Sequence, residues 1–227
     1  MKKMTIAVFL GSLLLTVVAA AASAAGTVNI TIVPQPEIPL EISDVQVAAT
    51  PAGVERLTYN LTDMSSQRLL AVEISWKFQL ANGRTMNTRA RADYLFSADG
   101  KLVPHATDPH AIGMLQHQGN TVPVDQITGE ITFAQFADGS ALGPDPGPMR
   151  LWLTSERQGQ MQALQQLLSV YKTQGESGLK NAIKTDSLSD TVAEHGLKML
   201  LSSLEQKQGF PAVVARLKEG AATQPPN

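Results

Sequence analysis

The sequence predicts an all-β plus α fold, in which an N-terminal antiparallel β-sandwich precedes a C-terminal region of three to four short helices. Residues 71–80 (AVEISWKFQL) alternate apolar and polar side chains without interruption, which sends one set to each face of a strand. About seven short segments of this kind, each bounded by turn residues, lie between residues 28 and 142. After a stretch rich in proline and glycine at 143–149, apolar residues recur at helical spacing.

The first residues have the layout of a secretory signal peptide. Lys2 and Lys3 form a basic start, an apolar run covers residues 5–22, and small residues at 22–25 suit cleavage. The alternative is an uncleaved membrane anchor, because the apolar run is nearly long enough to cross a bilayer. We expect cleavage and an exported protein, either periplasmic or extracellular. The expected units are a signal peptide at 1–25, a β-sandwich domain at 26–142, a linker at 143–149, a helical region at 150–220 and a disordered tail at 221–227.

Composition excludes several functional classes. The chain has no cysteine, so it can have no disulfide, no thiolate zinc site, no cysteine nucleophile and no lipid on an N-terminal cysteine. About 200 mature residues suffice for a core that holds the fold without disulfides. Loss of Lys2 and Lys3 would leave 16 basic against 20 acidic residues and change the formal net charge from −2 to −4. This acidic balance argues against nucleic acid as the main partner.

The expected strands follow one another from residue 28. Short alternating runs predict strands at 28–32, 40–47 and 57–61, the second of them bulged near Ser43 and Asp44, where the alternation slips. Asn82-Gly83 then predicts a hairpin with a type I′ turn, and the return strand covers 84–96. Residues 103–120 are expected to form a loop because they contain two prolines and a glycine, and the last good strand carries Ile127 to Phe133.

The helical region is expected to consist of short segments. Ser155 and Gln158 have the spacing of a capping box, which predicts that the first helix begins there. Gly175 predicts the end of that helix, and a short helix carrying Leu179 follows. A longer, leucine-rich helix is expected from about Leu188 to Gly209, and a last short helix begins near residue 211.

Trp76 gives the β region a likeness to known domains. With a tryptophan on a central core strand, residues 28–142 resemble immunoglobulin or fibronectin type III-like domains of bacterial exported proteins. The chain lacks the cysteine pair of antibody domains, so the fibronectin-like branch is nearer. The resemblance implies an interaction or spacer module. It carries over no functional residue and does not extend to the helical region.

One group of residues could bind a metal ion. His105, Asp108, His110 and His117 lie within thirteen residues, and imidazole with carboxylate can ligate zinc or another divalent ion. Their spacing matches no known zinc signature, and loop histidines are usually solvated, so the alternative is an ordinary surface loop. The sequence also contains no HExxH, P-loop or GxGxxG motif, and we expect no cofactor.

Basic residues on two neighbouring strands could bind an anion. The Asn82-Gly83 hairpin brings Lys77 beside Arg89 and Arg91, which could meet a glycan, a phospholipid headgroup or an acidic partner. The alternative is a solvated face whose charges protect the sheet from mispairing.

These observations favour a non-enzymatic exported protein that acts through protein–protein contacts or as a structural module of the cell envelope. The amphipathic helices need a cover for their apolar stripes, so we expect a protein partner or self-association through the C-terminal helices. Without its leader the chain has no segment apolar enough for a stable membrane span. The alternatives are a binding module for glycans or other anions that uses Lys77, Arg89 and Arg91, and a metal-dependent hydrolase that uses the loop from His105 to His117.

Overall fold

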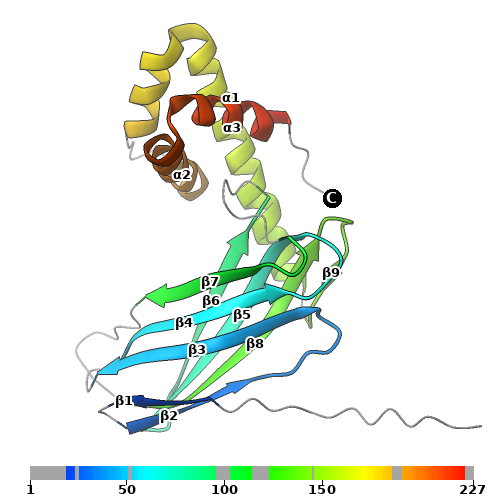
Figure 1. Cartoon of the computed structure of the whole chain (residues 1–227), viewed down its shortest axis with the longest axis vertical. Coiled ribbons are helices and arrows are strands. Elements are labelled where there is room, and N and C mark those ends of the chain that lie inside the picture. The colour runs from blue at the N-terminus through cyan, green and yellow to red at the C-terminus, as the bar shows by residue number, and fades with distance from the viewer. Residues whose placement is uncertain are drawn as a thin grey trace, which may run out of the picture.

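Two β-sheets face each other, and a group of helices stands at one end of them (Figure 1). This arrangement is seen in a computed structural model, and we refer to the sheets as the β body and to the helices as the helical head. The structure describes residues 19–23, 26–50, 53–95, 103–113, 123–144, 146–185 and 191–222.

The larger sheet contains the chain's central strands. Its order is β1 (Ala19–Ser23), β2 (Gly26–Ile32), β8 (Val124–Phe136), β5 (Leu69–Leu80) and β6 (Thr85–Asp93), and the two-residue β9 (Ala141–Leu142) pairs with β8. β2 and β8 run parallel, with Asn29 opposite Gln126, whereas the other pairs are antiparallel. β1 lies inside the stretch 1–25 that we expect to be cleaved; the rest of that stretch lies outside the described residues.

The smaller sheet contains β3 (Leu40–Thr50), β4 (Gly53–Asp63) and β7 (Thr107–Gly113), with β4 in the middle. The register of β3 against β4 shifts between Ser43 and Gln46, and Asp44 has a φ of 49°. The predicted bulge near Ser43 and Asp44 is therefore confirmed. Asp44 also accepts a hydrogen bond from Asn60 across the strands, at 2.8 Å.

The core of the β body is built around Trp76. The alternating apolar residues of β5 are all buried, namely Val72, Ile74, Trp76, Phe78 and Leu80. The indole tilts at 48° against the ring of Tyr59 in the facing sheet, with centroids 5.0 Å apart. Gly129 lies directly opposite Trp76, and a Cβ there would come within 2.6 Å of the indole. Glycine at 129 thus provides the space that the tryptophan occupies.

Two details of the β body differ from the prediction. The hairpin after β5 exists, but outside glycine the described residues with positive φ are only Asp44 and His105, so the type I′ turn at Asn82-Gly83 is wrong. Leu80 donates to Arg84 across a three-residue loop, and only Gly83 has a positive φ, 80°; this is a common hairpin geometry.

The loop expected at 103–120 is also wrong in part, because residues 107–113 form β7. Pro109 misled the prediction, since proline cannot donate a ladder hydrogen bond. β7 pairs only with β4 and has an open edge, where proline is tolerated.

The helical head consists, in the described residues, of α1 (Pro146–Lys184), α2 (Val192–Gln208) and α3 (Phe210–Ala222). α1 has 39 residues; it begins inside the expected linker at 143–149 and runs through Ser155, where we expected its start. Proline fits the first turn of a helix, and Met149 and Leu153 pack on Ala71 and Phe133 of the sheet. Tertiary packing therefore sets the beginning of α1.

Gly175 divides α1 into two helical segments, at the position where the first helix was expected to end. Its φ of 69° and ψ of −158° are non-helical, and the chain resumes helix with Leu179 and Ile183 buried in the head. α2 begins after Thr191, whose side chain accepts a hydrogen bond from the Glu194 N–H, and it ends at Gly209 as expected. None of the helices in the described part of the chain combines the length and hydropathy needed to cross a bilayer.

The predicted fold class, a β-sandwich followed by three to four short helices, is therefore wrong. The chain has a mixed α/β architecture, in which sheets of six and three strands, the short β9 included, carry a long helix and two further helices. The larger sheet also contains a parallel pair. The prediction treated the helices as an appendage after a linker. In the structure α1 covers one end of the outer face of the larger sheet and shares an apolar cluster with it.

Candidate functional site

Of the three proposed metal-binding residues that the structure describes, Asp108 and His110 lie close together. Asp108 and His110 lie on one face of β7, with Asp108 Oδ2 3.2 Å from His110 Nε2. His105 lies in the turn before β7, where its N–H donates to the carbonyl of Asp63. His117 lies outside the described residues. Within the described ranges no three histidine, aspartate or glutamate side chains are grouped closely enough to hold a metal ion.

Tyr94 joins Asp108 and His110 into a polar triangle at the edge of the two sheets. Its hydroxyl lies 3.1 Å from Asp108 Oδ2 and 3.1 Å from His110 Nε2. The imidazole also stacks on Tyr59, with ring centroids 5.1 Å apart and an interplanar angle of 9°. Tyr94 follows β6 of the larger sheet, whereas Asp108 and His110 belong to the smaller one, so the triangle fastens the two sheets together.

The electrostatics of this triangle favour uncharged rings. Burial raises the pKa of Tyr59 to about 12, and burial together with the charge of Asp108 raises the pKa of Tyr94 further. Burial lowers the pKa of His110 despite the opposing effect of Asp108. At neutral pH Tyr94 is therefore protonated and donates a hydrogen bond to Asp108.

The residues of the predicted basic patch share one face. Lys77, Arg89 and Arg91 are exposed on the outer face of the larger sheet. Arg91 is also held by other side chains, because its Nε lies 2.7 Å from Glu73 Oε2 and its guanidinium lies over the ring of Trp152 at 5.1 Å. Glu73 also accepts a hydrogen bond from Thr132. The structure thus leaves all three residues on the surface and ties Arg91 to α1.

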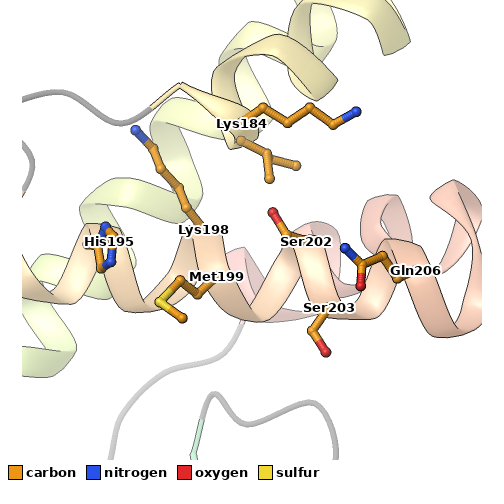
Figure 2. A pocket seen from close by; sticks show the side chains of 8 residues that line it. Lys184, His195, Lys198, Met199, Ser202, Ser203 and Gln206 are labelled. Atoms are coloured by element: carbon orange, nitrogen blue, oxygen red, sulfur yellow. The ribbon is translucent and has the colours of Figure 1, made fainter.

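A groove in the helical head offers a different surface (Figure 2). It has a volume of about 420 Å³ and is lined by Ile183, Lys184, His195, Lys198, Met199, Ser202, Ser203 and Gln206. Six of these residues come from α2, at spacings that place them along one side of the helix, and Ile183 and Lys184 come from the end of α1. We call this surface the α1–α2 groove.

Charge and exposure distinguish the α1–α2 groove. None of the eight described residues that line it is acidic, whereas Lys184 and Lys198 are cationic. Lys198 has a side chain only 9% exposed, and its Nζ lies 3.1 Å from the Thr185 carbonyl and 3.3 Å from Glu194. Met199 is 63% exposed. The groove is therefore lined by two apolar residues, Ile183 and Met199, together with basic and polar ones.

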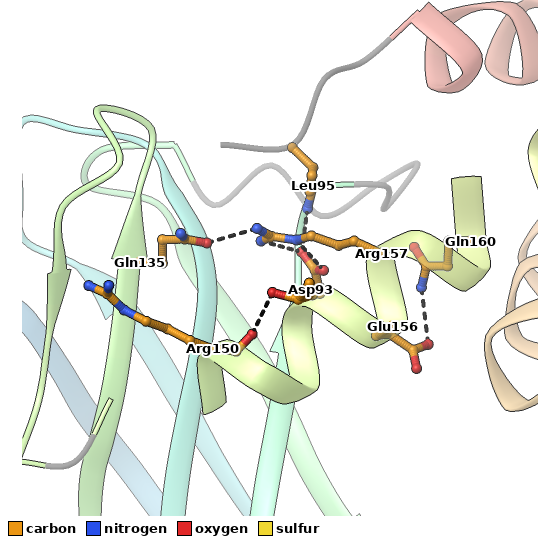
Figure 3. Close-up of polar contacts among 8 residues, drawn as sticks. Asp93, Leu95, Gln135, Arg150, Glu156, Arg157 and Gln160 are labelled. Atoms are coloured by element: carbon orange, nitrogen blue, oxygen red, sulfur yellow. Dashed lines mark hydrogen bonds and ion pairs between the residues drawn. The ribbon is translucent and has the colours of Figure 1, made fainter. Parts of the chain in front are cut away.

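A buried ion pair holds the helical head on the β body (Figure 3). Arg157 of α1 donates from Nε and Nη2 to the two carboxylate oxygens of Asp93, at 2.8 and 3.1 Å, and from Nη1 to Gln135 at 2.9 Å. The Arg157 and Asp93 side chains are 4% and 6% exposed. Asp93 also accepts from the Leu95 N–H. A bidentate pair of this kind fixes orientation as well as distance.

Sequence reasoning missed both the groove and the ion pair. Arg157 gave no local signal, since an arginine in a helix is ordinarily exposed and its partners lie far away in sequence. The groove had a partial signal: Met199 and His195 are four residues apart, on a helix whose buried stripe contains Leu197, Leu201 and Leu204. An exposed methionine next to such a stripe could have been identified as a surface feature.

Comparisons with known proteins indicate no activity. No protein family model and no curated protein matches the chain. Among solved structures, the putative ApaA protein from Bordetella pertussis covers 45% of this chain and 84% of its own length, at 14% identity and a TM-score of 0.32. A hypothetical protein from Peptoclostridium difficile 630 covers 52% and 91%, at 15% identity and a TM-score of 0.30.

A third structure, the uncharacterized lipoprotein yajI from Escherichia coli, covers 56% of this chain and 63% of its own length, at 12% identity and a TM-score of 0.26. None of these proteins is described by an activity. The resemblance to immunoglobulin and fibronectin type III-like domains stays a prediction.

Proposed function

We propose that the protein is exported and non-enzymatic, and that it binds a partner protein of the cell envelope through the α1–α2 groove. Export is supported by the leader-like residues 1–25. The polar clusters of the β body favour a binding role over an enzymatic one, because each of them fastens one structural element to another. These clusters are the triangle at Tyr94, the Glu73–Arg91 pair and the Arg157–Asp93 pair.

The observation that carries the proposal is the exposure of Met199 on the lining of the α1–α2 groove. Methionine is enriched at protein interfaces, where apolar side chains are surrounded by a polar rim. Ile183, which is 3% exposed, is the second apolar residue of the lining.

Charge complementarity specifies the partner's chemistry. Lys184, which is exposed, would attract carboxylates, and Ser202, Ser203 and Gln206 offer hydrogen-bonding groups along the same side of α2. The complementary ligand is an acidic segment of a protein that also carries at least one large apolar side chain.

A photo-crosslinking residue placed at position 199 of the full-length chain tests the proposal in cells. We expect one dominant adduct in the envelope fraction, and we expect Lys184→Glu to remove it because the groove then repels acidic segments. The matched control is the same crosslinker at position 151, since Leu151 is also an exposed apolar residue of the helical head, 76% exposed and outside the groove.

Equal adducts from positions 151 and 199 would contradict the proposal, as would adducts from position 199 that persist with Lys184→Glu. Circular dichroism of each variant identifies any loss of adduct that results from unfolding. If mass spectrometry of the protein from cells shows a chain that still begins at residue 1, export with cleavage is contradicted. The crosslinks would still decide whether the groove binds a partner.

A further inference from the structure

The edges of the two sheets differ in how they are protected against pairing with other strands. Open edges expose unpaired N–H and C=O groups, and proteins commonly block them with charges, prolines or bulges. β3 has Glu41, Asp44 and two register shifts, β6 has Arg89 and Arg91, and β7 has Pro109. Each of these three edges therefore carries a recognised blocking feature.

The fourth edge is different. β2 (GTVNITI) has no charged residue and no proline, and its composition favours extended structure. In the complete chain β1 pairs antiparallel with β2 along its outer side, from Ala19 opposite Ile30 to Ser23 opposite Gly26. β1 falls wholly within residues 1–25. Removal of the leader would therefore uncover β2 and leave the backbone N–H and C=O groups on its outer side without hydrogen-bond partners.

We propose that the uncovered β2 edge pairs with β2 of a second copy of this chain, and that β1 occupies the edge until the leader is removed. The inference rests on the leader cleavage of the proposed function and goes beyond it, since it involves a surface of the β body that lies outside the α1–α2 groove. β1 shows the geometry that the edge accepts, which is an antiparallel strand of about this length.

Self-pairing is favoured by the sequence of β2. In a twofold antiparallel pair the central residue faces its own copy and the others face residues of the same strand, so charges of one sign would meet like charges. β2 has none. A register centred on Asn29 overlaps all seven residues, places Val28 opposite Ile30, and keeps the apolar and polar positions of the two strands on matching faces. An acidic or basic partner strand would find no complementary charge there.

Sedimentation of chains 26–227 and 19–227 over a micromolar concentration series tests the proposal. We expect 26–227 to dimerise and 19–227, which retains β1, to dissociate at least tenfold more readily. Asn29→Lys in 26–227 should weaken the dimer at least tenfold, because two lysines would face each other at the twofold axis. Asn87→Lys is the matched control: Asn87 is also exposed, on the edge strand β6 of the same sheet, and we expect no change.

A cysteine substitution tests the register directly, because the chain has no cysteine of its own. Directly opposed residues of antiparallel strands are close enough for a disulfide, so Asn29→Cys should crosslink two chains under mild oxidation. Asn87→Cys should stay monomeric under the same conditions.

Monomeric 26–227 over the whole series would overturn the proposal. So would a dimer that survives Asn29→Lys, or equal association of 19–227 and 26–227. Asn29→Asp replaces the lysine variant if that variant does not fold. Met199→Ala in 26–227 separates the two proposals, since it removes the exposed apolar residue of the groove and should leave the β2 dimer intact. A leader that stays uncleaved in cells contradicts the proposed cleavage, and the sedimentation result for 26–227 still decides whether the edge pairs.

Discussion

The β body and the helical head are stabilised in different ways. In the body each strand is held by backbone ladders to its neighbours, and both sheets share one large apolar cluster around Trp76. In the head, three helices share a smaller cluster of leucines, including Leu164, Leu179 and Leu201. The head is fixed to the body through the first turns of α1, which combine the apolar contacts of Met149 with the ion pair of Arg157. The comparison teaches that the head's position depends on a few contacts, whereas the body's arrangement depends on many.

Among the predicted changes, loss of the Arg157 charge where the head meets the body should reduce the stability most. Arg157→Ala leaves the Asp93 carboxylate buried without its partner, and such changes cost about 3–5 kcal/mol. We expect the free energy of unfolding in urea to fall by roughly this amount. Arg150→Ala, on an exposed residue of the same helix, should change it by less than about 0.5 kcal/mol.

Hydrogen exchange shows which part of the molecule loses stability in Arg157→Ala. In Arg157→Ala we expect faster exchange in α1 near the junction, while β5 and β8 keep most of their protection. Uniform acceleration in the body and the head would contradict the view that the junction is a separate, weaker contact.

Replacement of two glycines of the head by alanine should change the stability in opposite directions. Gly175 has a φ of 69° and open space where a Cβ would lie, so Gly175→Ala introduces only backbone strain, and we expect a loss of about 1–2 kcal/mol. Gly196 also has open space at its Cβ but lies inside α2, where alanine should stabilise by about 0.5–1 kcal/mol. Thermal unfolding measures both. A stabilising Gly175→Ala would show that the interruption of α1 is not required by the head.

The smallest expected effect is a pH dependence in the body. Burial keeps the pKa of His110 below the 6.5 of an exposed histidine, so between the two values the unfolded chain binds more protons. Stability should therefore fall as the pH decreases below about 6.5. The groups that face His110 are Asp108, Tyr94 and Tyr59; Asp108 opposes the effect, and both tyrosines stay protonated in this range.

Urea unfolding between neutral and mildly acidic pH measures this slope, and His110→Gln should flatten it. His105→Gln, on an exposed histidine of the preceding turn, is the control and should leave the slope unchanged. A slope that survives His110→Gln would assign the pH dependence to other groups.

The β body was largely predictable because its signals are local. The alternation in β5, the bulge near Asp44 and the hairpin after Leu80 depend on residues close in sequence, and the structure contains all three. β7 was missed because an edge strand tolerates Pro109, and whether a strand lies at an edge depends on the whole sheet.

The head and the sites were less predictable because they depend on distant partners. The beginning of α1 is set by the contact of Met149 with Phe133, so the capping-box spacing at Ser155 was misleading. Of the described metal-site candidates, β7 places Asp108 and His110 on a common face, and His105 lies in the turn before this strand. Arg91 of β6 is held by Glu73 of β5 and by Trp152 of α1, and α1 is far from β6 in sequence.

The parallel pairing of β2 with β8 has a consequence for the order of folding. β2 is made early, but its neighbour β8 follows about one hundred residues later in the chain, and contacts over such separations slow folding. The helices contact one another over shorter separations and can assemble sooner once synthesised. β2 therefore waits for β8 until residues 124–136 have been made, and until then β1 is the neighbour in the larger sheet with which it can pair.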